Sequence, residues 1–402
     1  MNEFQQLEVT ELPGHKRDII IVGAGPAGGT AAAHLASKGH QVLFLDRSWF
    51  PRDKACGDIL LGDAIRAIDR LGLSEKVRQN GFPQTSITIS SPAGIECEVN
   101  PRECFSIRRS TLDGLIAREA VRRGAEFARA KVQNLRVRDD GLVECHCDGL
   151  ALPLVARTVV IATGANRDLL FRLGLAARSP VDGVALRYYV KSEIETQSLI
   201  FSYDPETVPG YRWLFPMGNG EYNIGCGIVT RDFRKANLRK ILDDFVTSYP
   251  AAKDVIDAKI ETAPPVGAGI RCSFKGVTGN PRIPALAIGD TAGATLPLTG
   301  EGIGKAMETG EDAAEVIHEA ITADQLDLLC RFPDRMHSKY RKLYRQYEWS
   351  QRWLSDRRLN NLIAGRMSKS PWLRDAVAQI ADQSVNPASI FSLQGIFRSI
   401  SS

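Results

Sequence analysis

The sequence predicts an α/β protein with a Rossmann-like dinucleotide-binding domain, a second domain built on an antiparallel β-sheet, and a C-terminal helical region. Three observations carry this prediction. An aliphatic run, a glycine-rich turn and an alanine-rich run follow one another in residues 18–36. Short segments of residues 184–229 alternate with period two, which is typical of hairpin strands. Residues 325–402 have helical patterns with aromatic residues and arginines.

The glycine-rich turn has the residues and spacing of a phosphate-binding turn. Residues 19–22 are all aliphatic and predict a buried parallel strand, and the turn Gly23-x-Gly25-x-x-Gly28 leads into a helix. Gly23 allows the sharp turn, Gly25 lets a pyrophosphate approach the backbone, and Gly28 lets helix and strand touch. The free N–H groups and dipole of the helix N-terminus would then hold the phosphates.

The next predicted strand, residues 41–46, ends in Asp46. Asp46 follows the glycine turn at about the sequence distance at which dinucleotide-binding domains place the carboxylate that binds a ribose hydroxyl. The alternative for Asp46 alone is a solvated strand end. A glycine turn between strand and helix, with an acid ending the following strand, favours dinucleotide binding.

Length and composition indicate an ordinary globular protein of two or three subdomains. The chain has 402 residues, of which 44% are hydrophobic and 24% charged. Its net charge is +4 with both signs interspersed, so nothing favours nucleic-acid binding. Basic residues gather in residues 331–358 and predict either peripheral contact with an anionic membrane or a solvated helix face.

The eight cysteines are scattered and contain no C-x-x-C pair. Cys145 and Cys147 have the wrong spacing for a zinc site and are expected on one face of a strand, so no metal is expected. Residues 1–16 lack the apolar core of a signal peptide, and no stretch is apolar enough to span a bilayer. These features predict a cytoplasmic protein in a reducing compartment.

The buried strands return at intervals, so the dinucleotide domain is expected in several pieces. Residues 158–165 and 285–290 each read as a buried strand that leads to a glycine turn. The expected division is residues 1–84, 106–178 and 281–322 for the dinucleotide domain, 85–105 and 179–280 for the substrate domain, and 323–402 for the helical region.

Five motifs carry a family resemblance. The N-terminal fingerprint, Ala162-Thr163-Gly164 and Gly289-Asp290-x-Ala292-Gly293 together resemble the FAD-binding proteins of the para-hydroxybenzoate hydroxylase fold. Within that fold, Pro51-x-x-x-x-Cys56-Gly57 and Tyr211-x-Trp213-x-Phe215-Pro216 are similar to the geranylgeranyl reductase family, over nearly the whole chain. The chain departs from that family after Gly57, since Asp58 and the next four residues replace a typical glycine and a proline-containing turn.

The resemblance implies an FAD site. It places the first glycines at the pyrophosphate, Asp46 at the adenosine ribose, Asp290 at the ribityl and pyrophosphate region, and residues 297–302 at the isoalloxazine, with Arg109 and Asp113 as a further pair. The alternative for Asp290 is a helix N-cap. The expected FAD-binding residues are Gly23, Gly25, Pro26, Ala27, Gly28, Asp46, Arg47, Arg109, Val132, Gly164, Asp290, Pro297, Gly300, Gly302 and Ile303.

Cys56 is the expected catalytic residue, because the resemblance places it beside the flavin ring and a substrate double bond. Hydride addition to an unactivated alkene requires a proton in concert, which Cys56 could supply or orient. The alternative is a small buried hydrophobe. Tyr211, Trp213 and Phe215 share one face of a strand and are expected either to pack in the core or to line a channel for an apolar substrate.

The expected function is therefore reduction of carbon–carbon double bonds in an isoprenoid or other lipophilic substrate, with FAD as cofactor. No second Gly-x-Gly-x-x-Gly motif is present, so NAD(P)H would bind transiently or a reduced carrier protein would donate electrons. The alternative is an FAD-dependent monooxygenase, or a halogenase, that acts on a natural product, although Lys54 does not match a halogenase lysine. A third reading is an electron-relay flavoprotein. The oligomeric state is not predicted.

Overall fold

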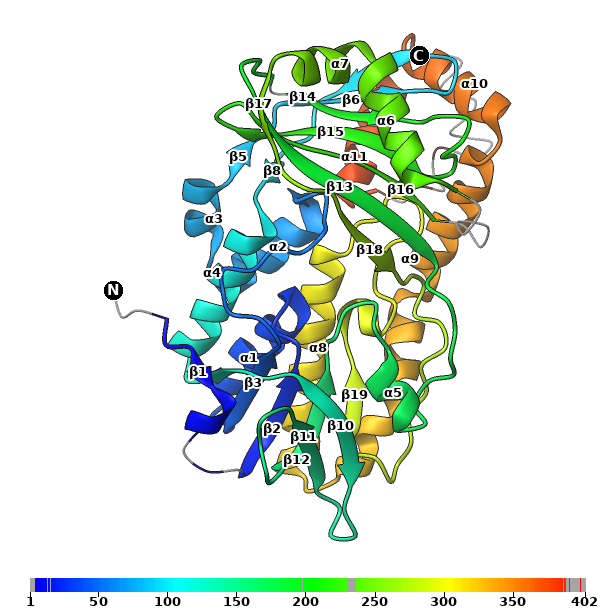
Figure 1. Ribbon diagram of the computed structural model, residues 1–402. Coiled ribbons are helices and arrows are strands. Elements are labelled where there is room, and N and C mark those ends of the chain that lie inside the picture. The colour runs from blue at the N-terminus through cyan, green and yellow to red at the C-terminus, as the bar shows by residue number, and fades with distance from the viewer. Residues whose placement is uncertain are drawn as a thin grey trace.

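The computed structural model describes residues 4–12, 14, 16–196, 198–229 and 236–385, together with Pro387, Ile390 and Arg398. Two eight-stranded sheets lie in the two halves of the molecule, the first in the lower half of Figure 1 and the second in the upper half. Helix α8 (Ile303–Thr322) runs beside the first sheet and begins between the two halves.

The first sheet has the order β1-β9-β3-β2-β12-β11-β10, with β19 also paired to β12. Its strands are β1 (Leu7–Glu8), β2 (Lys16–Val22), β3 (Val42–Asp46), β9 (Glu126–Arg129), β10 (Val132–Val137), β11 (Val143–Cys147), β12 (Leu154–Ile161) and β19 (Ala285–Ala287). The central strands β3, β2, β12 and β19 are parallel. The aliphatic run of β2 lies at the centre, where Ile19, Ile20 and Ile21 are fully buried because both faces are covered.

Helices cover both faces of the first sheet. One face packs on α1 (Pro26–Ser37), α4 (Arg109–Arg122), α8 and α9 (Phe332–Leu354), and the other carries the short helix α5 (Asp168–Arg172). Helices α1 and α8 approach closely, since a Cβ atom on Gly310 would lie 2.5 Å from the carbonyl oxygen of Ala27. Small residues in both helices therefore bring the two helix N-termini to the same region of the fold.

The second sheet has the order β17-β13-β16-β15-β14-β6-β7, with β18 also paired to β13. Its strands are β6 (Ser86–Ser90), β7 (Glu96–Val99), β13 (Gly183–Ser192), β14 (Ser198–Ser202), β15 (Tyr211–Gly218), β16 (Glu221–Ile228), β17 (Lys259–Thr262) and β18 (Val266–Ile270). The expected period-two segments form the antiparallel run β13, β16, β15 and β14. Residues 85–105, the first expected piece of the substrate domain, join this sheet through β6, which pairs parallel to β14.

Each face of the second sheet has its own cover. Helices α6 (Leu238–Ser248) and α7 (Pro250–Asp257) pack on the face that carries Leu214. Helices α10 (Arg357–Met367) and α11 (Pro371–Ala381) pack on the face that carries Trp213 and Phe215. The alternation of β15 therefore separates its aromatic residues from Leu214, as the sequence predicts.

A small third sheet and two helices connect the halves. It consists of β4 (Ile59–Leu60), β8 (Phe105–Ser106) and β5 (Phe82–Pro83), beside α2 (Gly62–Leu71) and α3 (Ser74–Asn80). The 3₁₀-helices η1 (Val9–Glu11), η3 (Gly289–Thr291) and η4 (Leu326–Arg331) complete the elements of the described chain. Most of the expected helical region beyond residue 385 lies outside the described residues. Within them, no helix combines the length and apolar character needed to cross a membrane.

Candidate active site

The glycine turn between β2 and α1 has the geometry that its spacing predicts. Gly23 has φ +108°, in the left-handed region, and its N–H donates to the Leu45 carbonyl at 2.7 Å. A Cβ atom on Gly28 would lie 1.9 Å from the Gly23 carbonyl oxygen. Only glycine permits this contact between helix and turn. Gly25 is the N-cap of α1, and Pro26 and Ala27 form its first turn, so free backbone N–H groups point out of the turn.

Gly25 differs from these glycines because nothing in the protein backbone crowds it. The nearest atoms to a Cβ built there are the Nη2 atoms of Arg109 and Arg52, at 3.7 and 3.8 Å. The space in front of the α1 N-terminus is therefore bordered by two guanidinium groups. Such a space suits a diphosphate, which needs backbone N–H donors and cationic side chains together.

The buried carboxylate of Asp113 holds both guanidinium groups, and the partly buried Asp46 also pairs with Arg52. Arg109 pairs with Asp113, with Nε–Oδ1 at 2.7 Å and Nη2–Oδ2 at 2.8 Å. Arg52 pairs with Asp113 at 3.0 Å and with Asp46 at 3.1 Å. Burial opposes the charge of Arg109, but the Asp113 carboxylate outweighs burial, so the pKa of the guanidinium is raised. Arg52 is a site residue that the sequence reasoning missed.

Asp46 lies where the sequence predicts it, at the end of β3 beside the glycine turn. Its Oδ2 accepts the Ala24 N–H at 3.1 Å, and its carbonyl accepts the Ala130 N–H at 2.7 Å. The partly enclosed carboxylate is thus tied to the turn, which contradicts the alternative of a solvated strand end. Val132 follows Ala130 at the start of β10, whereas the side chain of Arg47 is exposed.

A second glycine cluster lies at the ends of β12 and β19. Gly164 has φ +68°, and its carbonyl accepts the Thr291 hydroxyl at 2.9 Å. A Cβ atom on Gly164 would lie 3.7 Å from Nζ of Lys54, so this lysine also borders the predicted site. Burial first, and then the charge of Arg109, lower the pKa of Lys54, while Asp290 acts in the opposite direction.

Asp290 is tied to the loop that precedes α8. Its Oδ1 accepts the Thr295 hydroxyl at 2.6 Å. The N-caps of η3 and α8 are Ile288 and Gly302, so the alternative of a helix N-cap is wrong for Asp290. Ile303 then begins α8 directly after this loop.

The loop before α8 also meets the second sheet. The Tyr211 hydroxyl donates to the Thr299 carbonyl at 2.5 Å, and Gly300 has φ +67° beside that ring. The carbonyl of Pro297 accepts the Gln351 side-chain amide at 2.6 Å. The predicted isoalloxazine-facing loop and the aromatic strand are therefore in direct contact.

The two glycine clusters lie near one another, because Arg109 borders Gly25, Lys54 borders Gly164, and the charges of Arg109 and Asp290 both act on Lys54. Asp46 lies beside the first cluster, and the loop from Pro297 follows the second. An extended flavin dinucleotide needs contacts at both ends and positive charge at its diphosphate, and the residues present fit that requirement. When bound, FAD would supply a redox centre beside the α8 loop.

Cys56 is half-buried in the loop between the two sheets. Its Sγ accepts the Asp58 N–H at 3.3 Å. Burial, followed by the Asp58 charge, raises the pKa of the thiol, and Arg109 opposes them. The thiol therefore keeps its proton at neutral pH rather than ionising to a thiolate. A Cβ atom on neighbouring Gly57 would lie 3.2 Å from Cε2 of Phe215, so the loop packs against the aromatic strand.

The three aromatic residues of β15 form a continuous face. The ring centroids of Tyr211 and Trp213 are 5.9 Å apart, and those of Trp213 and Phe215 are also 5.9 Å apart. Trp213 and Phe215 are buried, and both pack toward α11. Tyr211 is half-buried and faces the α8 loop. Trp213 and Phe215 therefore lie in the core, Tyr211 packs against the same core cluster, and a role in substrate binding stays a prediction.

Several polar residues around Cys56 were not singled out from the sequence. Asp58 and Asn223 are fully buried next to Cys56, and Tyr189 donates its hydroxyl proton to Asp58. Near the α8 loop, Glu301 accepts the Gln383 amide at 3.0 Å, and Asp63 lies 3.3 Å from Nζ of Lys305. Burial, and then the charge of Asp63, raise the pKa of the Glu301 carboxyl to about 8. Asp58 is a chain neighbour of Cys56, whereas tertiary contacts bring Tyr189 and Asn223 to it.

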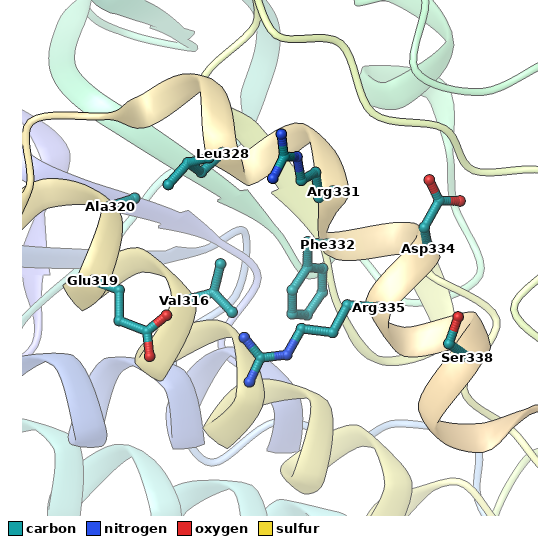
Figure 2. Close-up of a pocket in the computed structure, with 9 residues that line it drawn as sticks. All are labelled: Val316, Glu319, Ala320, Leu328, Arg331, Phe332, Asp334, Arg335 and Ser338. Atoms are coloured by element: carbon teal, nitrogen blue, oxygen red, sulfur yellow. The ribbon is translucent and has the colours of Figure 1, made fainter.

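A separate cavity of about 620 Å³ lies between α8 and the start of α9 (Figure 2). Its lining includes Glu319, Phe332 and Arg335. None of the predicted site residues lines it, so it is distinct from the candidate active site.

Two regions of the chain match the models of known protein families. Residues 16–147 match the FAD binding domain model, and residues 183–262 match the geranylgeranyl reductase catalytic domain model. The menaquinone reductase of Mycobacterium tuberculosis is 32% identical over 363 residues, which cover 80% of each chain. Digeranylgeranylglycerophospholipid reductase 1 of Methanopyrus kandleri is 29% identical over 343 residues, with 81% of this chain and 88% of the relative covered.

Solved structures confirm the fold. A geranylgeranyl bacteriochlorophyll reductase-like protein from Thermoplasma acidophilum superposes with a TM-score of 0.72 at 19% identity, with 96% of each chain covered. A flavin-dependent brominase superposes with a TM-score of 0.73 at 20% identity, with 96% of this chain and 98% of that chain covered. The architecture is thus shared by reductases and halogenases and does not by itself decide the reaction. The sequence relatives and the two matched models identify the family instead: the chain belongs to the geranylgeranyl reductase family of FAD-dependent oxidoreductases.

Proposed function

We propose that this protein reduces carbon–carbon double bonds of an isoprenoid or other lipophilic substrate by hydride transfer from reduced FAD. The observation that carries the proposal is the position of Cys56. Its thiol lies between Arg109, at the predicted diphosphate site, and the aromatic strand, against which Gly57 packs. A thiol that stays protonated can provide the proton that hydride addition to an alkene requires.

The relatives support this choice of reaction. Their names refer to a quinone and to a digeranylgeranyl lipid, and both are called reductases. A geranylgeranyl chain contains isolated double bonds, which an oxygen-activating flavin would not saturate. A flavin monooxygenase or halogenase is supported only by the shared fold.

The proposed FAD site uses the residues described above. Arg109 and Arg52 would hold the diphosphate against the N-terminus of α1, Asp46 would bind the adenosine ribose, and Asp290 would bind the ribityl region. Lys54 would lie beside the second glycine cluster. NAD(P)H or a reduced carrier protein is proposed as the transient electron donor, since the sequence has a single Gly-x-Gly-x-x-Gly fingerprint.

Peripheral membrane contact is a further part of the proposal. The exposed apolar side chains of the described C-terminal helices include Leu362, which is 60% exposed, and Trp349, which is 39% exposed. Arginines accompany them on α9 and α10. Co-sedimentation with anionic phospholipid vesicles, weaker with neutral ones, would support the contact, and no co-sedimentation with either would contradict it.

The decisive test is an anaerobic single turnover. Dithionite-reduced enzyme is mixed separately with geranylgeranyl lipids and with menaquinone. Flavin oxidation is followed by absorbance, and the product masses are measured by mass spectrometry. A geranylgeranyl product that gains two hydrogens, or a menaquinone product that keeps two added hydrogens after its ring is reoxidised in air, supports the proposal. A product that gains oxygen or halogen, formed only in air, would establish the alternative reaction. Oxidation of the flavin only by an added protein acceptor would instead indicate an electron relay.

A further inference from the structure

Asp58 combines complete burial with a backbone conformation that glycine would adopt at lower cost. Its exposed fraction is 0%, and its φ is +65°, in the left-handed region. Aspartate tolerates this region better than most residues but gains nothing from it. The turn itself therefore does not explain why an aspartate occupies position 58.

The two carboxyl oxygens have different surroundings. Oδ2 accepts hydrogen bonds from the Tyr189 hydroxyl at 2.5 Å and from Nδ2 of Asn223 at 2.8 Å. Oδ1 has no hydrogen-bond partner among the described atoms. A buried, unpartnered acceptor is unfavourable for stability, and in a native protein it calls for an explanation, of which a catalytic role is one.

The same residues also fix Cys56. The Asp58 N–H donates to Sγ of Cys56, and Nδ2 of Asn223 donates to the Cys56 carbonyl at 2.8 Å. Oδ1 of Asn223 accepts the Trp213 indole N–H at 2.9 Å. Asn223 thus connects the turn from Cys56 to Asp58 with the aromatic strand. Both the backbone and the thiol of Cys56 are held by this arrangement.

The surroundings of the Cys56 thiol act on its pKa in opposite directions. The Arg109 guanidinium favours a thiolate at Cys56, whereas burial and the Asp58 carboxylate favour the thiol and raise its pKa. Burial also raises the pKa of Asp58 itself to about 6, although its neighbours act to lower it. Those neighbours are Tyr189 and Arg187 on β13, Asn223 on β16 and Arg109 on α4. Asp58 is therefore ionised at and above neutral pH and counteracts Arg109 there.

We propose that Asp58 is a positioning residue for Cys56, which orients the thiol and keeps its proton in place for donation to the substrate. The inference rests on the proposed function. In the step it serves, one alkene carbon gains a hydride, with two electrons, from the reduced cofactor. The other carbon forms a C–H bond with the Cys56 proton as the S–H bond breaks, and the thiolate then regains a proton from water.

The test is the pH dependence of Cys56 alkylation by iodoacetamide, read on the Cys56 peptide by mass spectrometry. Asp58→Asn keeps an oxygen acceptor for Tyr189 and Asn223 but removes the charge. We expect its alkylation to rise at lower pH than in the wild type, with the two proteins alike below about pH 6, where Asp58 is protonated. Asp69→Asn, an exposed residue of α2, should behave as wild type. If Asp58→Asn does not fold, Asp58→Gly suits the backbone and removes the same charge.

The substrate half-reaction gives a second readout. In Asp58→Asn it should slow by up to about 100-fold, the cost of misplacing a reacting group by about 1 Å, and the loss should be greatest at high pH. An alkylation profile identical to wild type in both Asp58 variants overturns the proposal. A shifted profile in an enzyme that reduces no alkene keeps the effect of Asp58 on the thiol and overturns the proposed function instead.

Discussion

Asp113 on α4 orients Arg109 one turn earlier on the same helix, and the pair lies beside the glycine turn that opens α1. The carboxylate is fully buried and accepts two hydrogen bonds from Arg109, at 2.7 and 2.8 Å. It also pairs with Arg52 from the neighbouring loop at 3.0 Å. One buried carboxylate thus fixes two guanidinium groups next to Gly25, where a diphosphate would approach the backbone.

Arg109→Gln should weaken FAD binding while leaving the fold intact. The variant loses one charged donor at the predicted diphosphate, and Asp113 retains Arg52 as its partner. Hydrogen bonds to charged groups contribute about 1.5–3 kcal/mol, so the dissociation constant should rise roughly 10-fold to 100-fold. FAD fluorescence titration of the apoprotein measures it. Arg122→Gln, on the exposed part of the same helix, is the matched control and should bind FAD normally.

Gly25→Val and Gly28→Val should fail in different ways. A Cβ atom at Gly25 meets no backbone atom within 4 Å, so that variant should fold but fill the space that the pyrophosphate needs. At Gly28 the added atom would lie 1.9 Å from a carbonyl oxygen, so that variant should lose stability. We expect Gly25→Val to purify folded and colourless, by circular dichroism and flavin absorbance. Stoichiometric yellow FAD in Gly25→Val would count against the assigned site.

The central strands of the first sheet were predictable because burial on both faces leaves aliphatic runs in β2 and β12, whereas β1 and β9 were missed. Two strands of the second sheet were missed. β17 is exposed along its whole length and is polar, and β18 contains Gly267 and Gly269, so neither carries a period-two signal. Both pair with β13, and this tertiary contact determines their conformation.

The candidate site was predictable where a motif fixes the chemistry locally and was missed where distant segments converge. The family resemblance implied the pair of Arg109 with Asp113, and their i, i+4 spacing on a helix is compatible with their contact. The contact of Asn223 with Cys56 joins residues 167 positions apart, and nothing in their local sequence indicates it. Asp58 offered one signal, because it follows Cys56-Gly57 directly, but its burial depends on β13 and β16.

Glu301→Gln should change how stability depends on pH. The folded-state pKa of Glu301, about 8, lies above its ordinary value of 4.5, because burial and Asp63 disfavour the charge. Its contribution to stability is therefore complete below about 4.5 and is lost as pH rises through about 8. Glutamine cannot ionise. The melting temperature of Glu301→Gln relative to that of the wild type should therefore increase as the pH is raised from about 5 to about 9.

A control for the Glu301 experiment is Glu315→Gln, which removes an exposed carboxylate that pairs with Lys38. Its difference from the wild type should vary little over the same pH range, since exposed ion pairs contribute little. The effect of Asp58, which titrates at about 6, is common to all three proteins and cancels in the comparison. A constant difference between Glu301→Gln and the wild type would show that Glu301 is not enclosed as described.

The reductase and oxygenase hypotheses differ most in the role that they assign to Cys56. If its thiol supplies or positions the proton, Cys56→Ser should keep FAD and flavin reduction but slow the substrate half-reaction by about 10²–10⁴-fold, as is typical of general acid catalysis. Cys56→Ala should be slower still, because a hydroxyl can hold a water molecule and a methyl group cannot. Anaerobic single-turnover oxidation of reduced flavin measures both, with Cys330→Ser, the other half-buried cysteine, as control. With equal flavin loading, wild-type rates in both Cys56 variants would remove the thiol from the mechanism and with it the main structural support for alkene reduction.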